Sequence, residues 1–231
     1  PGGLDPKSWT TDDYMLAIDH LVALHDRFWN LGIDLSNYTW LGRPLESDLN
    51  FYIRAADSGL QNLTGKPANN HFGDDTDFIR ALQDLLKHAE RVAASLKTLP
   101  STFLHGDYWP GNLFIYPDGS LVAYDWQQAG IGPGILDLVN FIQRSLWWYE
   151  RLPVSPADLI QRYRDQLQQS SGFTIDDSQW ETLWNHALLW NFLTDWIGLL
   201  ADIPDPVLQT RYHLFRTVWI EPVKHAVSLY V

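Results

Sequence analysis

The sequence predicts a mainly α-helical protein that carries one small β-hairpin. Apolar residues recur every three to four positions along most of the chain, which is the period of amphipathic helices. Only residues 113–125 combine short apolar runs with a turn between them, as a hairpin requires. With 231 residues, of which 45% are hydrophobic, the chain can bury a sizeable core as one large domain or two small ones.

The first half of the chain contains two predicted long helices. Thr10 is typical of an N-cap, Asp13 follows at the third helical position, and apolar residues then recur at helical spacing. Residues 32–73 contain Gly, Pro, Asn and Ser without a sustained period, which predicts an irregular, partly helical segment. The helical pattern returns over residues 74–99 and ends at a proline.

The second half begins with short apolar runs and then becomes helical. The runs are residues 102–104, 113–116 and 121–124, and turn-forming Pro, Asp, Gly and Ser separate the last two, so residues 113–125 are expected to form the hairpin. A glycine-rich segment follows at residues 130–134. Helices are expected near residues 135–150, 156–170, 176–202 and 206–228.

The composition excludes several classes of protein. The chain has 16 Lys and Arg against 28 Asp and Glu, and this net charge of −12 repels a phosphate backbone and argues against nucleic-acid binding. No apolar run approaches the roughly eighteen residues of a membrane span, and no signal peptide is recognisable. The lack of cysteine excludes disulfides and thiolate metal sites and suits the reducing cytoplasm, where we expect the protein.

The densest group of chemistry-bearing residues lies in the segment HGDYWPGN, residues 105–112. This segment stands between a short predicted strand and the hairpin, and Asp125 ends the hairpin. Because the two ends of a hairpin lie close together, Asn112 and Asp125 are expected at one edge, beside Asp107. Carboxylate and amide oxygens are hard ligands that suit Mg²⁺, whereas zinc would prefer His or Cys. The pattern therefore predicts a metal site of the kind that handles phosphate groups.

The residues HGD at 105–107, with Asn112 five positions after the aspartate, resemble the catalytic loop of the aminoglycoside phosphotransferase and choline kinase superfamily, small-molecule relatives of the protein kinases. Protein kinases carry H-R-D-L-x-x-x-N in this loop, followed by D-F-G. Here D-W-Q at residues 125–127 stands in the place of D-F-G, a form similar to the ecdysteroid-kinase-like branch.

The resemblance extends over roughly the whole chain. The sequence LHDRFW at residues 24–29 is similar to the end of a helix in this superfamily. The glycine-rich residues 130–134, followed by Asp137, resemble the superfamily segment whose buried aspartate braces the catalytic loop. The implied fold is therefore the helical C-lobe of a protein-kinase-like fold.

The resemblance implies a role for each residue of the motif. Asp107 would be the catalytic residue that accepts or orients the proton of the substrate hydroxyl. Asn112 and Asp125 would hold Mg²⁺ at the phosphates of ATP, the phosphoryl donor. Three further residues would support the loop, namely His105, Gly106 and Asp137. For His105 a structural role that braces the backbone is expected.

The same resemblance implies an N-terminal ATP-binding lobe that is not recognisable in this sequence. No glycine-rich loop is followed by a strand with a phosphate-binding lysine, and the chain opens on proline. We expect a single kinase-like C-lobe over residues 1–231 without the N-terminal β-lobe, either a portion of a longer kinase or a naturally short protein. Its catalytic loop and hairpin would occupy residues 101–137, and its helical subdomain residues 1–100 and 138–231. Such a chain alone is expected to turn over weakly or not at all.

The implied substrate is a small-molecule alcohol, such as an aminoglycoside or choline. Rings next to carboxylates on the later helices would suit a cationic alcohol, but ordinary amphipathic helices explain the same pairs. A hydrophobic alcohol such as a sterol or a macrolide would also fit the twelve tryptophans. The pairs are Trp147-Trp148-Tyr149-Glu150, Glu181 with Trp184, and Asp195 with Trp196.

Two other functions are compatible with the sequence. The chain could be a noncatalytic, pseudokinase-like binding or scaffold module whose acidic helical surface engages a partner; such a module need not bind Mg²⁺ or nucleotide. It could also be a metal-dependent phosphohydrolase with Asp107 as the nucleophile. The aspartate-rich partner motif usual in that last class is not found.

Overall fold

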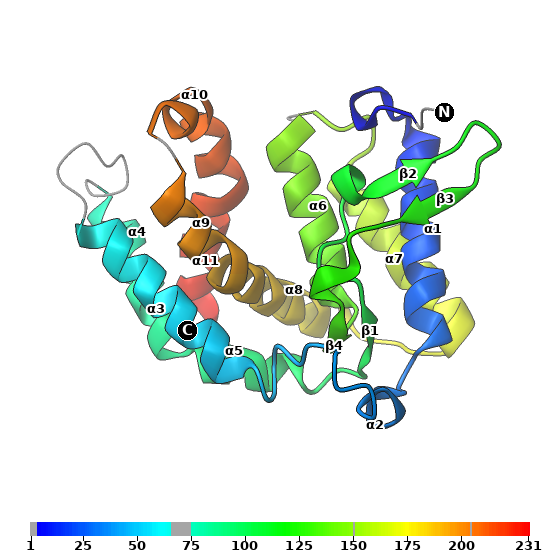
Figure 1. The fold of residues 1–231 in the computed structure, drawn as a ribbon, viewed down its shortest axis with the longest axis horizontal. Helices are drawn as coiled ribbons and strands as arrows, with labels where there is room; N and C mark the ends of the chain where they lie inside the picture. Colours follow the sequence, from blue (N-terminus) through cyan, green and yellow to red (C-terminus); the bar gives the residue numbers. More distant parts are fainter. Residues whose placement is uncertain (1–3, 66–74, 150, 204) are drawn as a thin grey trace. The chain divides into compact units, whose positions relative to one another are not determined.

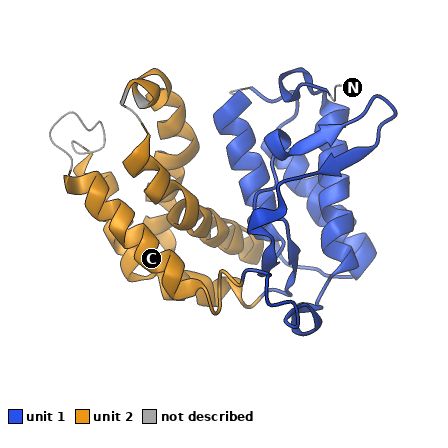
Figure 2. Cartoon of the chain, in the orientation of Figure 1, with its two compact units in different colours: residues 1–42, 99–177 blue, residues 43–98, 178–231 orange. Residues whose placement is uncertain are grey.

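The computed structural model describes residues 4–65, 75–149, 151–203 and 205–231. These residues are mainly helical and form two small antiparallel sheets, so the predicted fold class is confirmed (Figure 1). The chain divides into two compact units, residues 1–42 with 99–177 and residues 43–98 with 178–231 (Figure 2). The single C-lobe over residues 1–231 stays a prediction.

Unit 1 is built around two helices that pack along each other, α1 (Thr11–Arg27) and α7 (Pro156–Ser171). The predicted capping box starts α1, because the Thr10 side chain accepts from the backbone of Asp13 and the Asp13 carboxylate accepts from the backbone of Thr10. A similar cap starts α7, where the side chain of Ser155 accepts from the backbone of Asp158. The remaining helical segments are η1 (Pro6–Ser8), α2 (Gly32–Leu35), η2 (Pro110–Asn112), η3 (Trp126–Gln128) and α6 (Ile135–Tyr149).

The two sheets of unit 1 enclose the segment that carries the motif. The predicted hairpin is confirmed as β2 (Leu113–Ile115) paired with β3 (Leu121–Ala123). A second pair was not expected, since β1 (Thr102–Leu104) runs antiparallel to the glycine-rich β4 (Gly130–Gly132). The chain therefore runs from β1 through the motif and the hairpin, and then returns to pair with β1 as strand β4.

Unit 2 consists of helices. Two of its chain segments continue through a π-helical turn, in which the hydrogen bonds span one residue more than in an α-helix. The aromatic rings of these two turns pack on each other, with ring centroids 4.8 Å apart for Trp196 and Trp219. The elements are α3 (Leu49–Gly65), α4 (Thr76–Lys87), α5 (Ala89–Leu96), α8 (Asp177–Asn191), the turn Phe192–Trp196, α9 (Ile197–Asp202), α10 (Asp205–Phe215), the turn Arg216–Ile220 and α11 (Glu221–Tyr230).

Two sequence-based expectations for unit 2 need correction. The single helix expected over residues 74–99 is broken at His88, whose backbone leaves the helical region (φ −110°, ψ 14°) and whose ring Nδ1 bonds the carbonyl oxygen of Asp84 at 2.9 Å. The apolar period misses this break because both halves bury the same kind of face. Within residues 32–73, α3 is longer and more regular than expected, since Gly59 packs against Gly198 and tertiary packing offsets its low helix propensity.

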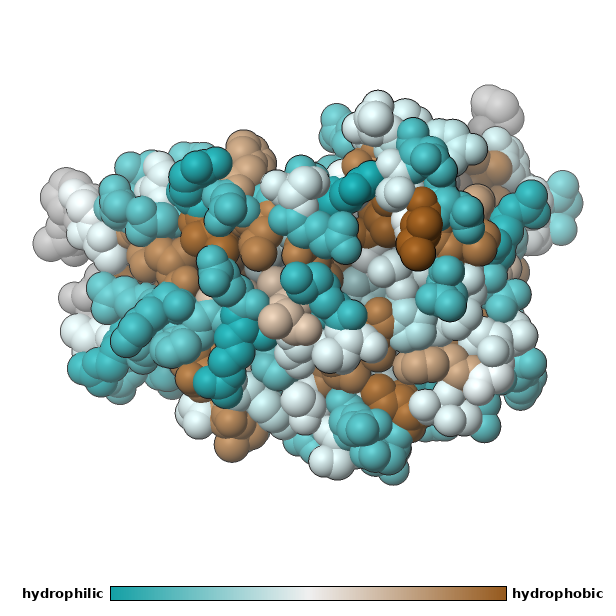
Figure 3. Space-filling model, turned by 90° about the horizontal axis from the view of Figure 1, so that it is seen from below, coloured by the Kyte–Doolittle hydropathy of each residue, from teal (hydrophilic) through white to brown (hydrophobic). Residues whose placement is uncertain are grey.

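No helix in the described parts of the chain is both long and apolar enough to cross a bilayer. On the face shown in Figure 3, apolar side chains form separate patches among hydrophilic ones.

Candidate active site

The motif forms a loop whose backbone is fixed by one buried carboxylate. Asp137, at the start of α6, is 1% exposed. Its Oδ2 accepts the backbone N–H of His105 at 2.8 Å, and its Oδ1 accepts that of Gly106 at 2.9 Å. Hydrogen bonds to a charged acceptor are shorter and stronger than neutral ones. Asp137 thus ties the first two residues of the loop to a helix.

The ring of His105 is buried inside the loop. Its Nδ1 accepts the backbone N–H of Asp107 at 3.2 Å, so its Nε2 carries the hydrogen and donates to the carbonyl of Tyr124 at 3.0 Å. The ring also packs on Trp126, with centroids 4.3 Å apart. His105 therefore connects the loop to the end of the hairpin, and the residue is fully buried.

Asp107 is the one carboxylate of the loop of residues 105–112, and it is enclosed. The residue is 8% exposed, and two side chains hold its oxygens. Asn112 donates from Nδ2 to Oδ2 at 2.7 Å and also to the backbone carbonyl of Asp107 at 3.0 Å. The guanidinium of Arg144 lies on the other oxygen, with Nη1 2.9 Å from Oδ1. The carboxylate is thus oriented from two sides.

Asp125 stands at the end of the hairpin beside Asn112. The pairing of β2 with β3 continues into a bond from the Tyr124 N–H to the Asn112 carbonyl at 3.0 Å, which brings the two ends of the hairpin together. Asp125 follows directly, is exposed, and has left-handed backbone angles (φ 65°, ψ 59°). A non-glycine residue in this region is uncommon, and such strain clusters at functional sites.

The candidate metal ligands are suited to a hard cation. Because the Nδ2 of Asn112 points to Asp107, its Oδ1 is the atom left for a metal, and Asp125 adds an exposed carboxylate. Within the described ranges, no three His, Cys, Asp or Glu side chains gather into a metal site. Two oxygen donors fit Mg²⁺, which keeps several waters and is usually bound by one or two protein groups plus phosphate oxygens.

The sequence did not single out Arg144, although a signal for it exists. Helix α6 is almost entirely buried, yet it carries polar residues at positions 137, 140 and 144, which lie on one helical face. Each of them contacts the loop: Asp137 as above, Asn140 through its Nδ2 to the Gly106 carbonyl at 3.4 Å, and Arg144 at Asp107. A polar stripe on a buried helix thus marks the face that supports the loop.

Asp137 is held in turn by a buried network from two other helices. The ring of His25 on α1 is fully buried and lies between Asp137 and Tyr163 of α7. Its Nε2 is 3.3 Å from Asp137 Oδ2, and its Nδ1 is 2.7 Å from the hydroxyl of Tyr163. Burial, and then the charge of Asp137, raise the pKa of Tyr163, so this hydroxyl stays neutral. The sequence does not predict this contact, because His25 and Asp137 are 112 residues apart.

The aromatic and acidic pairs proposed for the substrate differ in their surroundings. Trp147 and Trp196 are 3% exposed and belong to the core. Trp148 is 47% exposed and stacks on Trp109 of the motif, with ring centroids 5.8 Å apart. Glu150 lies outside the described residues. The pairs that belong to unit 2 are Glu181 with Trp184 and Asp195 with Trp196.

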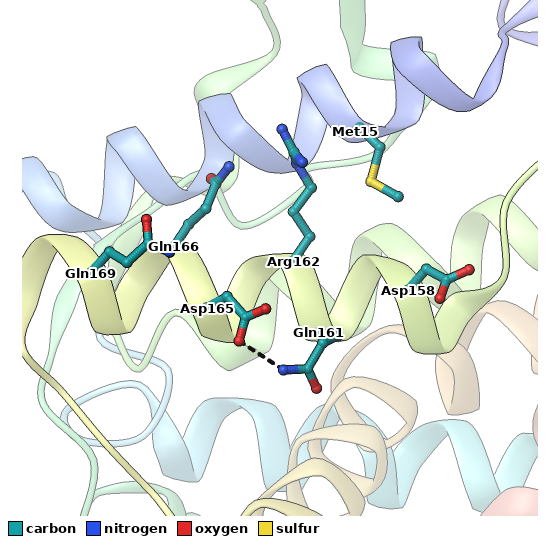
Figure 4. A pocket seen from close by; sticks show the side chains of 7 residues that line it. All are labelled: Met15, Asp158, Gln161, Arg162, Asp165, Gln166 and Gln169. Atoms are coloured by element: carbon teal, nitrogen blue, oxygen red, sulfur yellow. Dashed lines mark hydrogen bonds between the residues drawn. The ribbon is translucent and has the colours of Figure 1, made fainter.

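An open surface pocket of about 470 Å³ is lined by residues of α1 and α7. Figure 4 shows that Met15 comes from α1 and the other six lining residues from α7. Arg162 is bound to Asp19 of α1 through two bonds of 2.5 and 2.6 Å, so its charge is already paired. None of the lining residues belongs to the loop of residues 105–112 or to the hairpin.

The fold and the site together define a class of protein. The mainly helical fold, in which the loop of residues 105–112 is tied to α6 by the buried Asp137, is consistent with the C-lobe of a kinase-like protein. Consistent with this, the sequence profile of the phosphotransferase enzyme family matches residues 18–174. The chain belongs to the phosphotransferase enzyme family, and the superfamily resemblance is confirmed.

Solved structures of similar fold point the same way. An aminoglycoside phosphotransferase from Alicyclobacillus acidocaldarius is 16% identical (TM-score 0.54), and 98% of this chain covers 65% of that one. An AMP-bound spectinomycin phosphotransferase is 11% identical (TM-score 0.56; 98% and 69% covered). The choline kinase LicA from Streptococcus pneumoniae is 16% identical (TM-score 0.51; 99% and 67% covered). No curated protein sequence matches the chain.

Proposed function

We propose that the chain carries the catalytic residues for phosphoryl transfer from ATP to a hydroxyl group of a small molecule. The observation that supports this most is the placement of Asp107, an enclosed carboxylate held by Asn112 and Arg144 on a loop that Asp137 ties to α6. Phosphoryl transfer asks mainly for positioned groups and charge neutralisation, and this arrangement offers both.

In this proposal Asp107 orients the acceptor hydroxyl and takes its proton. The hydroxyl oxygen forms the new bond to phosphorus, the bond from phosphorus to the bridging oxygen of ADP breaks, and ADP leaves with that electron pair. Asn112 and Asp125 would hold Mg²⁺, which supplies charge neutralisation at the phosphates. His105, Gly106 and Asp137 keep the loop in place and touch neither substrate.

We also propose that the chain is the C-lobe of a longer kinase. No phosphate-binding glycine loop with its lysine strand is recognisable in the 231 residues, and the chain spans 65% of the first structure compared.

The acceptor is a small-molecule alcohol, and the net charge of −12 favours a cationic one. We expect this kinase in the cytoplasm, because a chain without cysteine suits that reducing compartment. The 231-residue chain alone is then a weak catalyst.

Nucleotide binding tests this function on the chain itself. Calorimetric titration with ATP should show binding that depends on Mg²⁺. The substitution Asp125→Asn should weaken this binding. Asp118→Asn is the matched control, because Asp118 lies in the exposed turn of the same hairpin. If neither Mg²⁺ nor nucleotide binds, the noncatalytic scaffold function is the better one.

Transfer itself is tested with labelled ATP. The chain, with Mg²⁺ and radiolabelled ATP, is incubated with separate hydroxyl compounds, such as choline, an aminoglycoside and a macrolide, and the products are identified by mass. Slow labelling of an alcohol by the chain supports the proposal. Release of phosphate with no labelled alcohol would instead favour the phosphohydrolase.

A further inference from the structure

The positive charge beside Asp107 comes from α6 and not from the loop. The loop sequence HGDYWPGN contains no lysine or arginine. Arg144, seven residues after Asp137 on the same helix, brings its guanidinium to 2.9 Å from Asp107 Oδ1. Asp137, which fixes the loop backbone, and Arg144, which reaches the side chain of Asp107, are therefore two helical turns apart on α6.

Surrounding side chains define where this guanidinium lies. The Arg144 side chain is 20% exposed, and its Cζ is 6.0 Å from the centroid of the Trp109 ring. Trp109 in turn stacks on Trp148, one helical turn beyond Arg144, at an interplanar angle of 25°. A guanidinium packed over an aromatic ring keeps its charge and loses part of its freedom, so less entropy is lost when it binds an anion.

The position next to the proposed base has a direct consequence. In phosphoryl transfer the acceptor oxygen lies between the base and the phosphorus atom, so a long cationic side chain beside the base is close to the reacting groups. Guanidinium groups bind phosphate through parallel N–H donors, which makes arginine a common ligand of phosphate groups.

We propose that Arg144 is a catalytic residue that binds the transferring phosphoryl group. This inference rests on the proposed kinase function. As the donor phosphate enters, the guanidinium moves from Asp107 Oδ1 onto the phosphoryl oxygens, and Oδ1 becomes available to the acceptor hydroxyl. No covalent bond to Arg144 forms or breaks, and the proton goes from the hydroxyl to Asp107.

The ion pair would be poorly explained by a purely structural role. Asn112 already orients Asp107 through two hydrogen bonds. Arg144 lies on Oδ1, which is the oxygen that Asn112 does not hold. A cation that leaves when phosphate arrives stabilises both states, the carboxylate before binding and the phosphoryl group during transfer.

A transition-state mimic tests this without turnover. The probe is Mg²⁺ and ADP with aluminium fluoride, compared by calorimetry with Mg²⁺ and ADP alone. Arg144→Gln should lose about ten- to hundredfold in the extra affinity that fluoride gives, because a charged hydrogen bond is removed. Arg144→Lys, which keeps the charge without the fork, should fall between, and Arg164→Ala, an arginine on α7, should match the unsubstituted chain.

The same measurement in chains that carry Asp107→Asn separates binding of the phosphoryl group by Arg144 from an effect of Arg144 on Asp107. If Arg144 binds the phosphoryl group, Arg144→Gln weakens fluoride-dependent binding in these chains too. Loss only when Asp107 is intact would overturn the inference and leave Arg144 as a residue that positions Asp107. An equal loss for ADP alone would also overturn it. If the unsubstituted chain binds neither probe, the proposed function fails, and the inference fails with it.

Discussion

Gly106 lies so close to the backbone of Gln128 that a Cβ at position 106 would stand 2.1 Å from the Gln128 carbonyl oxygen. Gly106 also has a φ of +83°, a region that side chains rarely enter. The Gly106→Ala substitution is therefore expected to lower the free energy of unfolding by about 3 kcal/mol or more, through backbone strain and overpacking together. Chemical denaturation measures the change.

Gly119 provides a matched control for this effect. It has nearly the same φ, +82°, but a Cβ there would meet no atom within 4 Å. Gly119→Ala should therefore cost only about 1–2 kcal/mol, the strain of a left-handed residue. Equal losses at the two positions would contradict the idea that the loop is fixed against residues 126–128.

Replacing the proposed base should remove phosphoryl transfer and leave the fold intact. Asp107→Asn keeps the size of the side chain but cannot take a proton, so the transfer rate should fall by about 100- to 10,000-fold. Asp118→Asn, in the exposed hairpin turn, should keep the original rate. Transfer is measured with labelled ATP, and circular dichroism checks the fold. Near-normal transfer by Asp107→Asn would remove Asp107 from the role of base.

Local features of the sequence predicted much of this fold. The hairpin follows from two short apolar runs around a Pro-Asp-Gly-Ser turn, and α1 follows from its capping box and apolar period. The candidate loop was recognisable because its residues are consecutive. Such signals depend only on residues that are close in the sequence, so contacts with distant parts of the chain do not change them.

Features that depend on distant contacts were not predictable in this way. The pairing of β1 with β4 joins segments 28 residues apart through a glycine-rich strand of weak propensity. The break at His88 leaves the apolar period unchanged on both sides. Arg144 approaches Asp107 only because α6 folds onto the loop, and the polar residues of α6 do not by themselves say what they contact.

The buried network behind the loop should contribute measurably to stability. Tyr163→Phe removes the hydroxyl that bonds His25 Nδ1 at 2.7 Å and leaves that nitrogen buried without its partner. We expect a loss of about 1–3 kcal/mol in the free energy of unfolding. Tyr116→Phe, which removes an exposed hydroxyl of the hairpin, should change it by less than about 0.5 kcal/mol. Equal stabilities for the two variants would contradict a role for this bond.

His186 makes the stability of the protein depend on pH in a defined direction. The residue is buried in unit 2, with Nδ1 3.1 Å from the Ser95 hydroxyl and its ring against Tyr230. Burial, and then the charge of Arg91, lower the pKa of His186 below its usual value. The unfolded chain therefore binds this proton at higher pH than the folded one, so the contribution is complete above about pH 6.5 and is lost as pH falls through the lowered pKa.

The measurement is the free energy of unfolding between pH 7.5 and pH 5, compared among three proteins because other groups also titrate. His186→Gln should make the decline toward acid shallower, since no imidazole then has to stay neutral in the folded state. Its stability at pH 7.5 should fall slightly through lost packing against Tyr230. His225→Gln removes an exposed histidine of the same unit and should keep the original slope. A slope that is unchanged in His186→Gln would show that protonation of His186 does not oppose folding.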